Sequence, residues 1–502
     1  MNFQFDKIKS DCLVSVGAQQ SVVESVISDS IAHGIERILS LSAESKPVSV
    51  DAGNGEAVVS GRINFKLVYL SENEPKSVDI FADFSERITS ELITPHSKLF
   101  ADMTIIDSEA VRDGVFKMRA VAETSLTALS EKESGCLFGA DAAVHTKKTR
   151  IPLTKHIASG TANAEITDEQ SVGANVGKIL HLDARSIVSS AKAGDGVILV
   201  TGDVAFTVLY YASEAVNSLN FRVPFGEEIR AEGVSLTDIV SAKASIAGAR
   251  IIITGDEDDN IIKVAADLRL RADAFMSYEE EVVLDGFSLK KELDFERGEL
   301  KLESFGGMNY YSDRVSGIAA LGDGRAAARD IAGIVGARNN LASVVPGDEG
   351  VTFEGLVTAA VIYTDENGLN SVQLEVPYSL NFAAKNMSPS SLLKAEAIVL
   401  SAEARVKRDR EIEVSADIAL KTDSYDEKTF ECVMSASEGA DKPQNNSAIS
   451  VYITSQGESI WDAVKALSAL PDDIIAQNPN LSIPFKGGEK IIYFRSLASE
   501  VG

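Results

Sequence analysis

Hydrophobic and polar residues alternate along three widely separated stretches of the chain. After Gly61, the apolar residues Ile63, Phe65, Leu67 and Tyr69 occupy every second position, and the same alternation follows Gly202 and Gly355. A period of two is typical of a β-strand with one face in the core and the other toward water. Each stretch leads through a polar turn into a second alternating run, which predicts a β-hairpin.

The three hairpins share the same spacing between landmark residues. A glycine is followed by a tyrosine after eight residues, by a second aromatic residue after fifteen more, and by an apolar residue four positions later. These sets are Gly61, Tyr69, Phe84, Ile88; Gly202, Tyr210, Phe225, Ile229; and Gly355, Tyr363, Tyr378, Phe382. A serine precedes the second aromatic residue by seven positions in each copy (Ser77, Ser218, Ser371). The constant spacing predicts a repeated unit with a fixed hairpin register and core-facing tyrosines.

Each hairpin is embedded in a longer β-rich segment. A short apolar run precedes each glycine, and two more strand-like runs follow each hairpin. We therefore predict a mainly β fold of three tandem sandwich-like repeats, each with its own core, at 1–147, 148–297 and 298–440, the first being the most divergent. The segments 17–40 and 312–337 are predicted to be partly helical, most clearly at Gly324–Gly336.

The end of the chain has a different character. Residues 441–448, which contain the polar run Asp441–Ser447, predict a linker, and 449–497 predict a small module of strand, helix, helix and strand. Ser459 with Asp462 suits the start of the first helix, and Pro471 suits the first turn of the second.

The charge and the cysteines restrict the class of protein. A net charge of −27, from 75 acidic and 48 basic residues, argues against a nucleic-acid or anionic-membrane binder and favours simple solubility or a basic protein partner. The longest apolar run is interrupted by polar residues and the start lacks a secretory apolar segment, so we expect no membrane span and a cytoplasmic location. Cys12, Cys136 and Cys432 are scattered, which predicts neither a disulfide framework nor a zinc site.

Residues with the spacing of a known catalytic site are absent from the sequence. The five histidines are isolated along the chain, and neither a nucleophile elbow nor a phosphate-binding loop is present. We therefore expect no enzyme activity, no metal and no cofactor. The acidic run Asp256–Asp259 is read as a solvated hairpin tip, with a divalent cation as the alternative.

The terminal module resembles a LysM domain through Tyr452–Ile453, Gly457–Lys465, Asp472–Leu481 and Pro484–Tyr493. LysM domains bind glycans that contain N-acetylglucosamine in a groove between two loops. The resemblance places that groove, for glycan or for protein, at Gln456, Gly457, Glu458, Ser459, Ile460, Asn478, Pro479, Asn480 and Ile483. In the alternative interpretation these residues only cap helices and shape turns.

The whole chain resembles the SPOCS-domain spore morphogenetic proteins. The triplicated hairpin, the tripeptides Asp273–Phe275 and Asp423–Tyr425, and the terminal LysM-like module carry this resemblance. It implies a non-enzymatic scaffold of the spore coat in the mother-cell cytosol, at the forespore surface. The implied partner is a SpoIVA-type morphogenetic ATPase of the coat basement layer. The alternatives are a peptidoglycan- or chitin-binding protein acting through the LysM domain, and an enzyme with an unrecognised site in the repeats.

Overall fold

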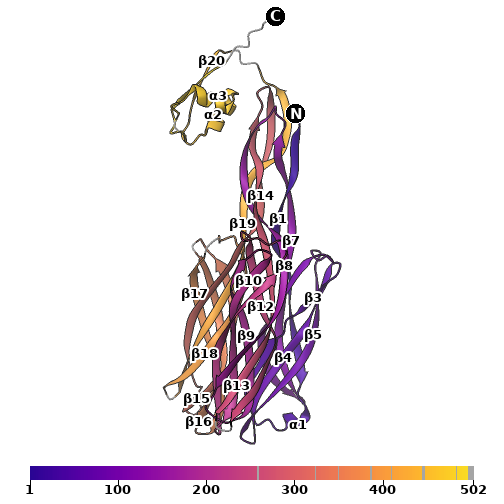
Figure 1. Ribbon diagram of the computed structural model, residues 1–502, viewed down its shortest axis with the longest axis vertical. Coiled ribbons are helices and arrows are strands. Elements are labelled where there is room, and N and C mark those ends of the chain that lie inside the picture. The colour runs from indigo at the N-terminus through magenta and orange to yellow at the C-terminus, as the bar shows by residue number, and fades with distance from the viewer. Residues whose placement is uncertain are drawn as a thin grey trace.

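The computed structural model describes residues 1–256, 259–322, 324–348, 350–384, 387–408, 410–443, 447–481 and 483–495. The protein is mainly β and elongated, with three visible parts: a broad body, a narrower stalk that rises from it, and a small module beside the stalk tip (Figure 1).

Three successive units follow one strand order. In each unit the first and the last two strands form one antiparallel sheet, and the strands between them form another. The first unit contains β1 (Phe3–Val26), β2 (Arg37–Ser45), β3 (Ser49–Ala52), β4 (Glu56–Ser71), β5 (Glu74–Thr89), β6 (Lys98–Asp113) and β7 (Val115–Ala140). Its sheets are β2–β4–β5, with β3 also paired to β4, and β1–β7–β6.

The second and third units have six strands each. The second contains β8 (His145–Ser171), β9 (Val176–Ala193), β10 (Val197–Ala212), β11 (Ala215–Arg230), β12 (Ile239–Asp256) and β13 (Asp259–Phe287). The third contains β14 (Lys291–Ala320), β15 (Asp330–Pro346), β16 (Gly350–Asp365), β17 (Gly368–Ala383), β18 (Leu392–Arg408) and β19 (Glu411–Asp441). Their sheets are β9–β10–β11 with β8–β13–β12, and β15–β16–β17 with β14–β19–β18.

The hairpin register explains the constant spacing between the landmark glycine and the second aromatic residue. Gly202 lies directly opposite Phe225, and Gly61 and Gly355 lie opposite Phe84 and Tyr378. A Cβ atom on Gly202 would come within 2.6 Å of the Phe225 ring and 2.2 Å of the Ile187 carbonyl oxygen. The aromatic ring therefore covers a backbone position that has no room for a side chain.

The landmark tyrosines are buried, as predicted, with Tyr69 and Tyr210 each 7% exposed and Tyr363 1%. The prediction that the opposite strand face meets water is wrong for the central strands. Asn64, Lys66 and Val68 are buried, and Val68 joins the equivalent Leu209 and Ile362 in one apolar cluster shared by all three units. The units therefore have a core of their own and a second core between them.

The helical predictions in the repeats were wrong, apart from one short turn. Strand β1 runs through to Val26, and helix α1 covers only Asp29–Ala32. The described part of 312–337 is not helical, and β15 begins at Asp330 and pairs with β16. Gly324 and Gly336 adopt positive φ angles, and strand pairing outweighs the helix propensity of the alanine-rich run.

The stalk is formed by the outer ends of six strands: 3–13 and 129–140, 145–156 and 275–287, and 291–305 and 425–441. It begins at three equivalent strand pairs, Leu13–Leu129, His156–Phe275 and Phe305–Tyr425. Farther along, Leu137, Val283 and Val433 meet in a fully buried apolar cluster. The three cysteines are free and buried, and burial raises the pKa of Cys136 to about 12.

The C-terminal module consists of β20 (Ile449–Ile453), α2 (Ile460–Leu467), α3 (Pro471–Gln477) and β21 (Lys490–Phe494). Strands β20 and β21 pair antiparallel, and both helices contribute to a small core. Among the described residues, none of the helices has the length and apolar character needed to cross a bilayer.

Candidate functional site

The first predicted loop of the terminal module is organised by local hydrogen bonds. The Gly457 amide donates to the Phe485 carbonyl at 3.4 Å, and Glu458 accepts from the Ser455 amide at 2.7 Å. The Ser459 amide donates to Asp462 at 2.8 Å in a capping box, and Ile460 packs against the module core. Gln456 and Gly457 remain exposed. Most of this loop therefore holds the module together.

The second predicted loop is dominated by Asn478. Its amide nitrogen donates to the carbonyls of Ile474 and Ile492 at 2.9 and 2.8 Å, and its Oδ1 accepts from the Ile492 amide. Asn478 thus ties α3 to β21, whereas Pro479, Asn480 and Ile483 are exposed. The first loop instead approaches Phe485 and Gly487, so its neighbours lie beyond Ile483.

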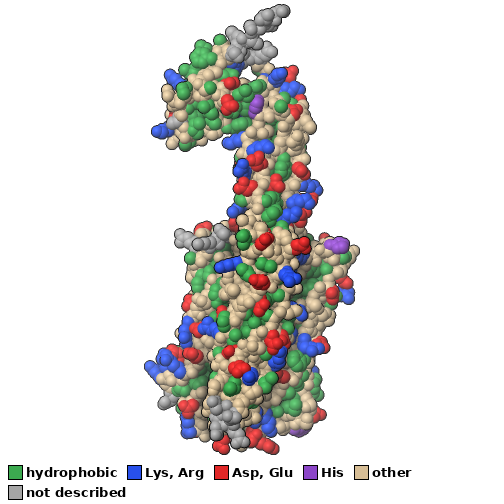
Figure 2. Space-filling view, in the orientation of Figure 1, with side chains coloured by type: hydrophobic (Ala, Val, Ile, Leu, Met, Phe, Trp, Pro, Cys, Tyr) green, Lys and Arg blue, Asp and Glu red, His purple; other side chains and the backbone are tan. Residues whose placement is uncertain are grey.

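The outer face of the two-stranded sheet was not singled out by the sequence. Ile449 lies opposite Phe494, and Val451 lies opposite Ile492. These four side chains and Ile453 are 38–61% exposed, so five large apolar residues share one open sheet face. Figure 2 shows hydrophobic side chains gathered on this module. An exposed apolar face of this kind is typical of an interaction surface.

The opposite side of the module is anchored to the stalk tip through Asp285. This carboxylate accepts from Trp461 Nε1 at 2.8 Å, and Lys465 and Arg297 reach it at 2.8 and 2.9 Å. The Phe287 ring meets Trp461 edge-on at 5.3 Å. Burial alone would raise the pKa of Asp285, but the hydrogen bonds from Lys465 and Trp461 outweigh burial and hold it below its usual value.

A second candidate site lies at the centre of the body. A cavity of about 980 Å³ is lined by residues of all three units, with seven basic and six acidic side chains. Two sets of these side chains occupy equivalent positions in the three units. Asp102, Lys243 and Glu396 come from β6, β12 and β18. Glu44, Arg185 and Arg338 come from β2, β9 and β15.

The first set, which we call the paired triad, is Asp102, Lys243 and Glu396. Lys243 contacts Asp102 and lies 3.5 Å from Glu396, while Lys394 lies 2.8 Å from Asp102. Burial would raise the pKa of Asp102, but the charges of Lys243 and Lys394 hold it well below its usual value. Lys421 completes this network between Glu396 and Asp423.

The second set, the open triad, is Glu44, Arg185 and Arg338. Glu44 lies 3.0 Å from Lys66, and Arg185 pairs with Asp183. Arg338 donates to the Ala43 carbonyl oxygen at 2.5 Å. Burial, with a contribution from Asp183, raises the pKa of Glu44 to about 7.

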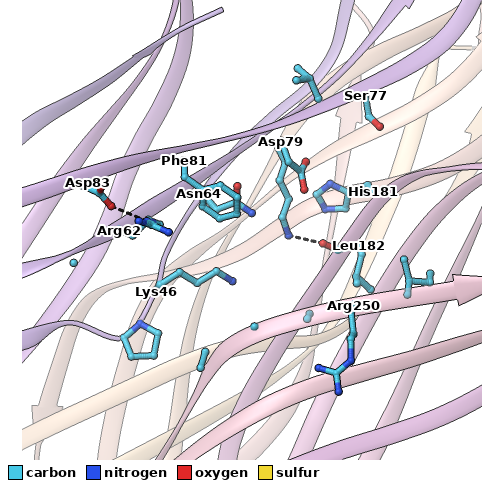
Figure 3. Close-up of a pocket in the computed structure, with 18 of the residues that line it drawn as sticks. Lys46, Arg62, Asn64, Ser77, Asp79, Phe81, Asp83, His181, Leu182 and Arg250 are labelled. Carbon is cyan, nitrogen blue, oxygen red and sulfur yellow. Dashed lines mark hydrogen bonds and ion pairs between the residues drawn. The ribbon is translucent and has the colours of Figure 1, made fainter.

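A groove of about 850 Å³ lies between the first two units, and its lining includes Lys66, the partner of Glu44 in the open triad (Figure 3). Lys66 is buried in this lining and donates to the Leu182 carbonyl. Arg62 pairs with Asp83 at 2.6 Å (Figure 3). His181 is also buried in this lining, and burial together with Lys66 lowers its pKa to about 3, which keeps it neutral. Between the second and third units, Arg222 bridges to Asp417 at 2.9 Å.

A histidine, a serine and an aspartate do come together near the stalk base. His156 Nε2 lies 3.1 Å from Asp273 and 3.2 Å from Ser159, but Ser159 donates directly to Asp273. Serine and aspartate thus share one ring nitrogen, which is not the relay of a nucleophilic triad. Among the described residues, His, Cys, Asp and Glu form no group that could hold a metal ion. The acidic tip Glu257–Asp258 lies outside the described residues.

Comparison with known families finds a match in the middle unit. Residues 175–253 match the family model described as SipL, SPOCS domain. The matched segment covers β9, β10, β11 and most of β12, which includes the Gly202–Tyr210 hairpin. The SPOCS match indicates a sporulation-related role. A search of curated proteins and a search of solved structures each gave no match.

Proposed function

We propose that this protein is a non-enzymatic scaffold of the spore coat that binds a SpoIVA-type morphogenetic ATPase through its terminal module. The SPOCS match supports a role in sporulation. The exposed face of Ile449, Val451, Ile453, Ile492 and Phe494 is the observation that carries the binding role. Its apolar character suits a protein partner, since protein interfaces bury apolar cores.

The module's attachment supports the same proposal. Trp461 and Lys465 hold one side of the module to Asp285 at the stalk tip, and the apolar face belongs to the sheet rather than to this anchored helix. In the scaffold, the stalk acts as a spacer that holds the module away from the broad body (Figure 1).

Binding of the full-length chain to a purified SpoIVA-type ATPase, measured by biolayer interferometry, tests the proposal. Val451→Lys should weaken binding at least about tenfold, because a charge would enter an apolar interface. Ile252→Lys is the matched control, since Ile252 is 58% exposed on the body, and it should leave the affinity unchanged. Equal affinities for all three proteins would refute the role of this face.

The alternative function is glycan binding by the module, for which exposed Pro479 and Asn480 are the relevant residues. Sedimentation of the full-length chain with purified peptidoglycan distinguishes the two. Saturable binding that is lost in Asn480→Lys but kept in Val451→Lys would favour the glycan function. Absence of sedimentation, together with ATPase binding, supports the scaffold.

A further inference from the structure

The backbone of the terminal module fixes which main-chain groups face out of its two-stranded sheet. In an antiparallel pair, the N–H and C=O groups of alternate residues bond to the neighbouring strand, and those of the residues between them point outward. The Thr454 amide donates to the Glu489 carbonyl and the Arg495 amide to the Ala448 carbonyl, both at 3.0 Å. With the observed register, the even-numbered residues of β20 bond to β21 and the odd-numbered residues face outward.

The outer edge of β21 is closed by two side chains of helix α3 and its C-terminal end. Asn478 accepts from the outward amide of Ile492 at 2.9 Å and donates to the Ile492 carbonyl at 2.8 Å. Gln477 makes the same two contacts with Phe494, at 2.7 and 3.2 Å. Two side-chain amides therefore take the place of a third strand on this side of the sheet.

The outer edge of β20 is open. Among the described residues, no group bonds to the outward N–H or C=O of Ile449, Val451 or Ile453. Edge strands are normally protected by a charge, a proline or a bulge. Strand β20 reads Ile-Ser-Val-Tyr-Ile and pairs with β21 without a register shift, so it has none of these protections. The three outward residues are β-branched and 55–61% exposed, which suits pairing with a further strand.

We propose that the open edge of β20 pairs with an extended segment of the protein partner, which adds a third strand to the sheet. This assignment rests on the proposed function and specifies how the partner binds. The outward N–H and C=O groups supply main-chain hydrogen bonds to the incoming strand. Every second side chain of that strand lies beside the exposed apolar face of the module. The segment is therefore apolar at alternate positions and lacks proline where its amides are paired.

The charge of the chain favours such a partner over a second copy of this protein. A second copy would offer the same open strand, but each copy carries a net charge of −27, so two copies repel one another. A partner segment with lysine or arginine beside its apolar positions is instead attracted. Dimers of the chain that disappear in Val451→Pro, measured by analytical ultracentrifugation, would assign the edge to a second copy and overturn the proposal.

Hydrogen exchange of the full-length chain, alone and saturated with a purified SpoIVA-type ATPase, tests the added strand directly. We expect the amides of Ile449, Val451 and Ile453 to exchange at least about tenfold more slowly in the complex, because they become hydrogen-bonded. The amides of Ile492 and Phe494 should change little, since they are bonded already. A complex without added protection over 449–453 would overturn the added strand and leave the proposed ATPase binding intact.

A proline at the open edge provides the second measurement. Val451→Pro removes an outward amide without breaking a bond to β21, so the module should fold and keep its Trp461 emission. It should weaken ATPase binding at least about tenfold, because a donor is lost and the proline ring obstructs the incoming strand. Lys490→Pro is the matched control at an exposed, outward-facing position of β21, and it should leave the affinity unchanged.

The outcomes separate this assignment from the proposed function. Equal affinities of Val451→Pro and the unmodified chain would overturn strand pairing while ATPase binding stands. Failure of the unmodified chain to bind the ATPase would overturn the proposed function and the added strand together.

Discussion

The stalk and the body are built from the same strands, but apolar side chains fill the centre of the stalk and charged side chains line the centre of the body. In the stalk, equivalent positions of the three units hold the apolar residues Leu137, Val283 and Val433. In the body, equivalent positions hold acids in some units and bases in others, as in the paired triad of Asp102, Lys243 and Glu396. The same threefold arrangement therefore encloses an apolar core at one end and a charged cavity at the other.

This contrast between an apolar and a charged centre gives a physical reason for the sequence differences among the three units. Apolar residues can be alike in all three units, because they attract one another whatever their identity. Charged residues at equivalent positions must differ, since three like charges around one centre would repel. The triads of the body thus make the units non-interchangeable. The first unit contributes the acidic residues Asp102 and Glu44, and Asp102 contacts lysines of the other two units.

The largest expected loss of stability comes from a charge placed in the stalk core. Val283 is fully buried, and Val283→Asp would place a carboxylate there without a partner. We expect the free energy of unfolding to fall by about 4 kcal/mol or more, measured by chemical denaturation. Met276→Asp on the same strand is the control, since Met276 is 40% exposed, and it should cost under about 1 kcal/mol. Similar losses in both variants would mean that the stalk centre is not a closed core.

The second prediction concerns Glu44 in the charged cavity of the body. The pKa of Glu44 is raised to about 7 in the folded protein from an ordinary 4.5, through burial and Asp183 and against Lys66 and Lys46. The folded state therefore keeps a proton that the unfolded chain releases, so stability falls as the pH rises from about 4.5 to about 7. Glu44→Gln removes this loss and should be more stable than the unmodified protein at pH 8, by up to about 3 kcal/mol.

Denaturation midpoints at several pH values measure this effect. At about pH 3 the two proteins should differ little, because Glu44 is then protonated in both the folded and the unfolded state. Glu228→Gln, at an exposed position, is the control and should retain the pH dependence of the unmodified protein. The same pH slope in Glu44→Gln as in the unmodified protein would show that Glu44 is not the titrating group.

Local sequence patterns predicted the hairpins, but they did not predict the buried residues at the contacts between the units. The spacing of Gly202, Tyr210 and Phe225 follows from strand pairing and ring packing within one hairpin, so it is visible in the sequence. The alternating pattern predicts that Lys66 faces solvent, but it is buried where the first unit meets the second and contacts the Leu182 carbonyl. The equivalence of Glu44, Arg185 and Arg338 becomes visible only when positions are counted back from the repeated tyrosine.

In the terminal module, too, local features could be predicted from the sequence and distant contacts could not. The helix caps were predicted, including Ser459 with Asp462. The anchor at Asp285 was not, because Asp285 lies 176 residues from Trp461. The exposed sheet face required the register of β20 against β21, which fixes which side chains share a face.

The smallest expected effect concerns the polar contact that ends the apolar stalk. Asp285→Ala removes the acceptor of Trp461 and the ionic partner of Lys465 and Arg297. We expect a loss of about 1–2 kcal/mol in docking of the module, because a hydrogen-bonded charge is removed from a partly buried site. Trp461 is the single tryptophan of the chain, so its fluorescence emission should shift to longer wavelength on release.

The pH dependence of the same signal provides an independent check. Since the pKa of Asp285 is held below its usual value, docking is stabilised at neutral pH and lost as the pH falls through that lowered value. The unmodified protein should therefore show a red shift on acidification that Asp285→Ala already shows at neutral pH. Asp294→Ala, at an exposed position of β14, should behave like the unmodified protein. Unchanged Trp461 emission in Asp285→Ala would show that the Phe287 contact alone holds the module.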